Sequence, residues 1–221
     1  MSATNGGGSV QLEPLPLPKA GASPSLCLAS NQVIITGEQG SRLLPPARSD
    51  APIPKWIPTS YGISKASPDG KWLAIFQPYG RLLNLYRLPA IELVATLTNH
   101  ASISAVEFSP RGDEVAVASY RGVDLWECET WKRRRHLSDF IGLLYAPRSG
   151  TLWLAKDFRT AGLYDAHTLQ PLLPLPSGTL PLAVSPNGRY LAVSVDARRL
   201  QVWDLVEARA RLRELGLDWG E

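Results

Sequence analysis

Cysteine, histidine and methionine are scarce in this chain of 221 residues, which has only two, three and one of them. Cys27 and Cys128 lie far apart and neither belongs to a Cys-x-x-Cys pair, so we expect two small buried thiols instead of a redox or zinc site. His100, His136 and His167 show no paired spacing and have no cysteine or carboxylate at ligand separation. The sequence therefore predicts no metal site and no cofactor.

Long apolar runs are absent as well. No stretch of about 18 apolar residues occurs, and the first ten residues, MSATNGGGSV, lack the basic and apolar segments of a secretory signal. The net charge of +3 is too small to indicate a nucleic-acid partner. We expect a soluble, cytoplasmic protein with no membrane partner.

Sequence motifs of catalysis are missing too. The chain contains no Gly-x-Ser-x-Gly elbow, no phosphate-binding Gly-x-x-x-x-Gly-Lys-[Ser/Thr] loop and no kinase signature set. Asp113 and Glu114 are adjacent carboxylates, but neighbours along a strand point to opposite faces, so we interpret them as solvated turn charges. We predict no catalytic residues and no enzymatic activity, and a propeller hydrolase or dehydrogenase is the least favoured alternative.

The chain does contain a repeat with a period near 40 residues. The stretches GISKASPDGKWLAIF, AVEFSPRGDEVAVAS, GLLYAPRSGTLWLAK and PLAVSPNGRYLAVSV share a turn proline between two apolar runs. An aromatic anchor follows each proline after 16 to 18 residues. The prolines are Pro68, Pro110, Pro147 and Pro186, and the anchors are Tyr86, Trp126, Tyr164 and Trp203.

The turn at each proline has a physical explanation. Proline presets φ for the second turn position, and the glycine that follows adopts a positive φ that other residues resist. This predicts tight turns at Gly70, Gly112 and Gly188, each joining two antiparallel strands. In APRSG the glycine comes one residue later, so we expect a longer loop or a bulge around Arg148 and Ser149.

Further strand-like stretches, IELVATL, WKRRRHL and LQPLLPL, follow the aromatic anchors and bring the number of strands per period to four. The apolar runs are continuous, as in sheets that are covered on both faces. The predicted fold is all-β: a β-propeller of four-stranded antiparallel blades, about five blades if residues 25–56 form a degenerate one. It forms either a closed ring, which we expect, or a partial arc.

One repeat is specific enough to suggest a family. TLTNHASISAVEFSPRGDEVAVASYRGVDLWE resembles the WD-repeat pattern, with Asn99-His100 in place of its Gly-His pair and Leu125-Trp126 near its Trp-Asp end. Val202–Asp204, VWD, matches that end, and the similarity extends over residues 59 to 206. The resemblance implies a non-catalytic scaffold for protein–protein interaction. The tail LRELGLDW, Leu212–Trp219, also resembles the ends of large bacterial WD-repeat Ser/Thr protein kinases, whose kinase domain this sequence does not contain.

The repeats depart from the family in their polar residues. The resemblance implies a bonded set of loop His, strand Ser or Thr, turn Asp and repeat Trp in a blade, but no blade has all four. The blade with His100, Ser119 and Trp126 has no Asp in the corresponding turn. We therefore expect blade stability to come mainly from apolar packing, with His100 bonded within its own blade.

Residues Trp131 to His136, WKRRRH, form the most basic stretch of the chain. Lys132, Arg133, Arg134 and Arg135 are candidate partner-binding residues, and the alternative function is binding of nucleic acid or another polyanion through them. We favour an outermost strand whose charges prevent edge-to-edge aggregation. The protein partner is not identified by the sequence, and Lys65 and Ser104 are expected near the central axis.

The two ends of the chain suggest how a ring could close. We divide the chain into a mobile Gly/Pro-rich leader at 1–24, a propeller at 25–206 and a C-terminal helix and tail at 207–221. Within the leader, residues 9–13, SVQLE, alternate like a strand. We predict that they pair beside residues 200–205, because apolar residues recur at helical spacing after Asp204 and leave the last blade without an outer strand.

Overall fold

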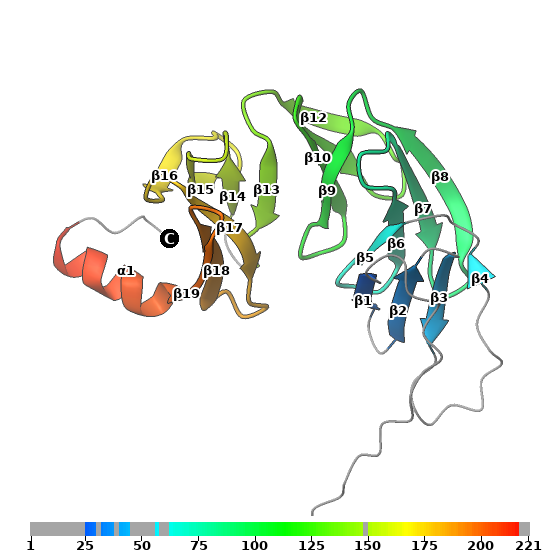
Figure 1. Ribbon diagram of the computed structural model, residues 1–221, viewed down its shortest axis with the longest axis horizontal. Helices are drawn as coiled ribbons and strands as arrows, with labels where there is room; N and C mark the ends of the chain where they lie inside the picture. The colour runs from blue at the N-terminus through cyan, green and yellow to red at the C-terminus, as the bar shows by residue number, and fades with distance from the viewer. Residues whose placement is uncertain are drawn as a thin grey trace, which may run out of the picture.

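The structure is a computed structural model that describes residues 25–29, 32–37, 40–44, 56–57, 62–147 and 150–216. The leader at 1–24, its predicted strand at 9–13, and the loop residues Arg148 and Ser149 lie outside the described residues. Within them, the strands form five antiparallel sheets, which we call blades 1 to 5 in chain order, arranged along an arc (Figure 1). The prediction of an all-β propeller of about five blades is confirmed.

Each blade is a meander in which successive strands pair with one another. Blade 1 contains β1 (Ser25–Ala29), β2 (Gln32–Gly37), β3 (Gly40–Leu44) and β4 (Trp56–Ile57). Blade 2 contains β5 (Ile63–Ala66), β6 (Trp72–Phe76), β7 (Leu82–Arg87) and β8 (Glu92–Thr98). Blade 3 contains β9 (Ile103–Phe108), β10 (Glu114–Ser119), β11 (Gly122–Glu127) and β12 (Arg133–Leu137). Blade 4 contains β13 (Gly142–Tyr145), β14 (Thr151–Ala155), β15 (Ala161–Asp165) and β16 (Pro171–Pro174).

The last blade is shorter. Blade 5 contains β17 (Thr179–Val184), β18 (Tyr190–Val195) and β19 (Arg199–Asp204), and no fourth strand pairs with β19 among the described residues. The helix α1 (Leu205–Glu214) follows β19 directly, with the Asp204 side chain accepting hydrogen bonds from the N–H groups of Val206 and Glu207 as its N-cap. The predicted incompleteness of this blade is confirmed for the described part of the chain.

The turns at the repeat prolines have the expected geometry. Gly70, Gly112 and Gly188 have φ values of 72°, 71° and 73°, in the region that favours glycine. In blade 2 the Ser67 hydroxyl donates to the Asp69 carboxylate at 2.6 Å and accepts from the Trp72 N–H at 2.9 Å. These bonds hold the two inner strands of the blade in register.

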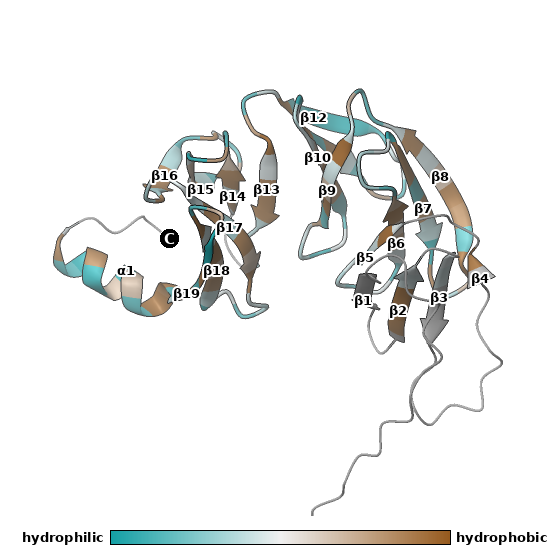
Figure 2. Cartoon of the chain, in the orientation of Figure 1, coloured by the Kyte–Doolittle hydropathy of each residue, from teal (hydrophilic) through white to brown (hydrophobic). Residues whose placement is uncertain are grey.

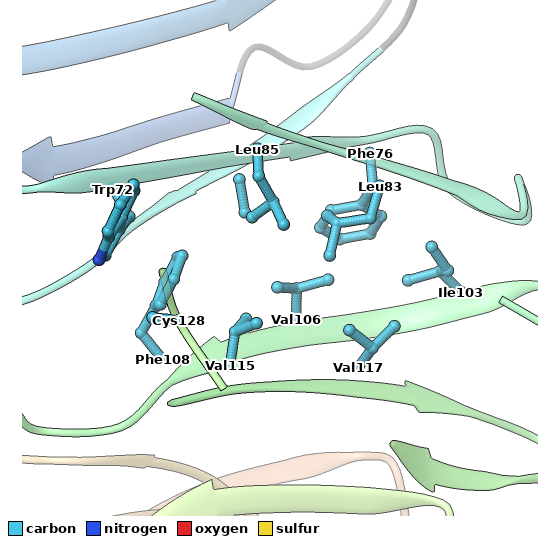
Figure 3. Close-up of a cluster of buried hydrophobic side chains, with 11 residues drawn as sticks. Trp72, Phe76, Leu83, Leu85, Ile103, Val106, Phe108, Val115, Val117 and Cys128 are labelled. Carbon is cyan, nitrogen blue, oxygen red and sulfur yellow. The ribbon is translucent and has the colours of Figure 1, made fainter. Parts of the chain in front are cut away.

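Apolar side chains fill the space between blades. All five residues of β6 are buried, because one face of the strand packs on blade 1 and the other on blade 3. Figure 3 shows the cluster between blades 2 and 3, where Leu83 and Leu85 lie opposite Val106, Val115 and Val117. Equivalent clusters join blades 1 and 2, 3 and 4, and 4 and 5. Continuous apolar runs are thus explained by sheets covered on both faces.

The aromatic anchors occupy equivalent positions in the third strand of their blades. Tyr86, Trp126, Tyr164 and Trp203 pair with Leu73, Val115, Leu152 and Leu191, respectively. Tyr86 and Tyr164 are buried, whereas Trp126 and Trp203 are only partly buried. Both tryptophan rings still pack against an inter-blade cluster.

The arc is open in the described part of the chain. No strand pairing and no buried cluster joins blade 5 to blade 1 among these residues, and Figure 1 shows the two end blades apart, with α1 extending away from the sheets. The first strands of successive blades contact one another, so β1, β5, β9, β13 and β17 form the inner wall of the arc.

Candidate binding surface at the loop tips

The basic stretch forms β12, the outermost strand of blade 3, which Figure 2 shows as hydrophilic. The three arginines of β12 are all engaged within the chain. The Arg134 guanidinium contacts the Glu127 carboxylate, and Arg135 donates to the backbone carbonyls of Ala166 at 3.3 Å and His167 at 3.5 Å in blade 4. These contacts support a structural role for the strand.

Asp124 contacts two further side chains of β12. Its carboxylate is buried on β11 and lies 2.8 Å from His136 Nδ1 and 3.3 Å from Arg133 Nη1. A buried carboxylate needs such partners because desolvation of an unpaired charge is costly. Arg133 and His136 therefore fix the outer strand to its neighbour. Of the four candidates, Lys132 is the one for which the structure shows neither a side-chain hydrogen bond nor an ion pair in the described residues.

The sequence interpretation of one acidic residue needs correction. Glu114 is not a solvated turn charge, because its carboxylate accepts a hydrogen bond at 2.7 Å from the hydroxyl of Tyr145 in blade 4. Burial and the neighbouring Glu114 charge raise the pKa of Tyr145 far above its ordinary value, so the phenol remains a donor. Asp113 is more exposed and pairs with Arg111 at 2.8 Å, as a turn charge is expected to do.

His100 also differs from expectation. Its ring is exposed, and its backbone carbonyl accepts a hydrogen bond from Arg81 at 2.6 Å. The neighbouring Asn99 is the buried polar residue of this connection, and its side-chain amide donates to the Ala101 carbonyl at 3.0 Å. The loop between blades 2 and 3 is thus held by Asn99 and Arg81 instead of by a histidine ring.

The two cysteines are close to their prediction. Cys128 is buried, and desolvation raises the pKa of its thiol to about 12. Cys27 is half-buried, and its Sγ lies 3.4 Å from Ser64 Oγ. No three His, Cys, Asp or Glu side chains come together at metal-binding distance within the described ranges.

The connections between strands fall on two opposite ends of the blades. The proline turns, which join first to second strands, lie at one end, because successive strands are antiparallel. The loops joining second to third strands lie at the other end, beside the connections from blade to blade. Hydrogen bonds show this: Tyr79 N–H donates to Ile103 O at 3.3 Å, and Gly178 N–H donates to Arg159 O at 3.0 Å.

Three neighbouring blades present an exposed aromatic side chain at this second end. Tyr79 in the β6–β7 loop is 85% exposed, Tyr120 in the β10–β11 turn is 69% exposed, and Phe158 in the β14–β15 loop is 79% exposed. Large apolar side chains on a monomer surface are most informative when they gather in one region. Here they occupy the same loop of blades 2, 3 and 4.

Tyr79 has in addition an unfavourable backbone conformation. Its φ is 62°, which is a rare value for a bulky residue. Two hydrogen bonds between the loop and β9 of blade 3 hold this conformation: Tyr79 N–H donates to Ile103 O, and Ile103 N–H donates to Gly80 O at 2.7 Å. Strain that presents an aromatic ring to solvent contributes nothing to the core, and such strain is typical of functional positions.

An arginine follows the aromatic residue in each of these loops. Arg81, Arg121 and Arg159 stand one or two residues after Tyr79, Tyr120 and Phe158, respectively, and all three are exposed. Arg81 is fixed by the carbonyls of Asn99 at 3.2 Å and His100, and the Arg121 guanidinium lies 5.8 Å from the centre of the Tyr120 ring. We call these six residues the loop-tip surface.

Sequence reasoning missed this surface, although a pattern was present. The sequences PYGR, SYRG and DFRT each follow the second apolar run of their repeat. An aromatic residue in a turn is unusual because turns favour Gly, Asn, Asp, Ser and Pro. Alignment of the repeats on their loops, instead of on their prolines, would have shown the recurrence.

The inner wall of the arc provides a second set of polar groups. Lys65 on β5 lies 3.1 Å from the Glu107 carboxylate on β9, and Ser104 on β9 is exposed. Lys65 and Ser104 therefore lie on the innermost strands, as expected. The lysine charge is neutralised by its neighbour, so this wall offers no unpaired cationic site at Lys65.

No helix in the described part of the chain is long and apolar enough to cross a membrane. Among families of known proteins, the one named "WD domain, G-beta repeat" matches residues 91–127. The matched segment begins just before β8 and ends with β11, so it joins the outer strand of blade 2 to the first three strands of blade 3. No curated protein matches the chain closely enough to be a relative. The matched repeat and the antiparallel four-stranded sheets together support a WD-repeat propeller.

Proposed function

We propose that this chain is a non-catalytic scaffold that binds a protein partner at the loop-tip surface. WD-repeat propellers serve generally as platforms for protein–protein interaction, and the matched repeat supports that class for this chain. The single observation on which the location depends is the recurrence of an exposed aromatic residue with an adjacent arginine in the same loop of three blades.

The composition of the surface indicates the chemistry of the partner. Tyrosine and arginine are enriched among the residues that contribute most to protein interfaces. The aromatic rings would bury apolar side chains, and the guanidinium groups of Arg121 and Arg159 would pair with carboxylates, so the partner is a protein segment with both apolar and acidic residues. Rigid presentation lowers the entropy lost on binding, and the fixed backbone at Tyr79 serves this purpose.

Site-specific photocrosslinking tests the location. A photoreactive amino acid placed at Tyr120 or Phe158 should crosslink one protein from the native cell extract. The same amino acid at Arg111, an exposed turn residue at the opposite end of the blades, should not. Crosslinks that appear only at Arg111 would contradict the proposed location.

Substitutions measure the contribution of the surface once the partner is purified. The triple variant Tyr79→Ala/Tyr120→Ala/Phe158→Ala should weaken binding at least 100-fold, because each buried aromatic anchor contributes about 1–2 kcal/mol or more. Arg111→Ala should leave the affinity within about twofold. Saturable binding of a labelled oligonucleotide to the wild type, lost in the triple variant, would instead favour a nucleic-acid partner.

The resemblance of Leu212–Trp219 to bacterial kinase-linked propellers and the cytoplasmic location both remain part of this proposal. They would place the scaffold beside a signalling enzyme in the same cell compartment. Sequencing of the neighbouring genes in the source genome tests this: a Ser/Thr kinase gene beside or fused to this one is the expected result.

A further inference from the structure

One face of blade 5 is exposed where the same face of the other blades is buried. We call the face of a blade that packs on the next blade in the chain its onward face. In blade 3 it contains Ala116, Ala118, Val123 and Leu125, all of them buried against blade 4. The same positions in blade 5 are occupied by Ala192, Ser194, Leu200 and Val202.

The correspondence follows from register. Ala116 pairs with Leu125 next to the Trp126 anchor, and Ala192 pairs with Val202 next to the Trp203 anchor. Yet Leu200 is 78% exposed and Val202 is 70% exposed. The helix α1 contacts β19 without covering this face, since none of its residues is buried. Blade 5 therefore presents the apolar face of an inter-blade contact with no blade against it in the described part of the chain.

The opposite end of the arc has the complementary face. On β2 of blade 1, Ile34 and Thr36 are fully buried toward blade 2, so by strand alternation Val33 and Ile35 point the other way. Both are only half-buried. In blades 2 to 5 the corresponding face packs on the onward face of the preceding blade. In blade 3 this face contains Val115 and Val117.

We infer that the onward face of blade 5 binds the face of blade 1 containing Val33 and Ile35 in a second copy of this chain. The two faces are those of a normal blade-to-blade contact, and within one chain they do not meet among the described residues. A contact between different surfaces of two copies is heterologous, and it closes when the second copy returns the same contact. The stack of blades then continues from one copy into the next. This inference does not depend on the loop-tip surface, which lies at the ends of the strands.

Measurement of molar mass in solution tests the inference. Multi-angle light scattering of the full chain at micromolar concentration should give a dimer or a larger closed ring. The variant Leu200→Asp/Val202→Asp should be a monomer. Leu93→Asp is the matched control, because Leu93 is 54% exposed on the outer strand β8 of blade 2, away from both ends of the arc. It should associate like the wild type.

Mixing of two variants tests the head-to-tail arrangement. Ile35→Asp alone should also be a monomer, although each chain retains an intact blade 5. An equimolar mixture of Ile35→Asp with Leu200→Asp/Val202→Asp restores one intact contact and should give a dimer. Circular dichroism and thermal unfolding of each variant should show a wild-type fold. A monomeric wild type, or association that Leu200→Asp/Val202→Asp leaves unchanged, overturns the inference; a dimer in Ile35→Asp alone overturns the head-to-tail arrangement.

Discussion

Blades 3 and 5 are built from similar sequences and differ in how much of them is buried. The strand β10, EVAVAS, is buried at every position except Glu114, whereas β18, YLAVSV, is fully buried only at Leu191 and Val193. Both strands are apolar on consecutive residues. The difference arises from neighbours: blade 3 lies between two blades, and in the described part of the chain blade 5 has a blade on one face only. An apolar sequence therefore indicates that a strand can be buried, whereas its actual burial depends on the neighbouring blades.

The proline turns of blades 2 and 5 show the opposite behaviour, because the two turns are alike although the burial of their blades differs. Ser67 donates to Asp69 at 2.6 Å, and Ser185 donates to Asn187 at 2.7 Å. The backbone N–H two residues after the Asp or Asn is 3.1 Å from its side-chain oxygen in both. These turns are closed by residues within six positions of one another, so exposure of blade 5 leaves its turn unchanged.

The largest expected effect comes from the onward faces. Leu125→Ala in blade 3 should lower the free energy of unfolding by about 2–5 kcal/mol, because it leaves a cavity between blades 3 and 4. Val202→Ala at the equivalent position in blade 5 should change it by less than about 0.5 kcal/mol at protein concentrations where the chain is monomeric. Urea unfolding measures both. Equal effects at the two positions would mean that blade 5 is covered within a single chain.

The edge of β19 with which no strand pairs in the described residues provides the next test. We propose that residues 9–13 pair with this edge, as the alternation of Val10 and Leu12 suggests. Deletion of residues 1–15 should then lower the midpoint of thermal unfolding by several degrees, through loss of strand hydrogen bonds and apolar contacts. Val10→Asp/Leu12→Asp should have a similar effect and Thr4→Asp/Asn5→Asp none. An unchanged midpoint after the deletion contradicts the proposal.

Substitution of the turn glycines should reveal a smaller difference in stability between blades 3 and 5. Gly112→Val and Gly188→Val should each cost roughly 1–2 kcal/mol, because both residues have a positive φ. A Cβ at Gly112 would also lie 2.6 Å from the Asp69 carboxylate of blade 2, whereas at Gly188 the nearest atom is 3.9 Å away. The blade 3 variant should therefore be the less stable of the two in urea unfolding. The reverse order would show that contact between neighbouring turns is unimportant.

The smallest effect concerns pH. Burial raises the pKa of Asp69, but the Ser67 hydroxyl, the Lys71 N–H and the Lys71 ammonium outweigh it and hold the pKa below its ordinary value. A lowered pKa in the folded state stabilises it above the unfolded value of about 4, and this contribution is lost as the pH falls through the folded pKa. Asp69→Asn should flatten the acid side of the stability profile, and Asn187→Asp should steepen it. Thermal unfolding between about pH 2 and pH 5 measures the two slopes.

Much of the fold could be predicted from the sequence because its determinants are local. The apolar run Trp72–Phe76 forms β6 with the same bounds. The stretch around Arg133–Arg135 forms the outer strand of blade 3, and the segment after Asp204 forms a helix that Asp204 caps. Proline, glycine and a strand-length apolar run act within a few residues, so their effects are visible in one dimension.

The fates of the charged and aromatic side chains were decided only by tertiary structure. The arginines of β12 are not available as a binding patch, because they contact Asp124, Glu127 and a backbone carbonyl of blade 4. Glu114 is bonded by Tyr145, which is 31 residues away in sequence. Tyr79, Tyr120 and Phe158 lie at the same end of their blades because successive blades stack in the same orientation. The exposure of Leu200 and Val202 follows from the absence of a sixth sheet in the described residues. The sequence by itself determined the blades, through short-range turn and strand preferences. The stacking of the blades decided which side chains remain exposed for binding, because burial and ion pairing depend on residues that are distant along the chain.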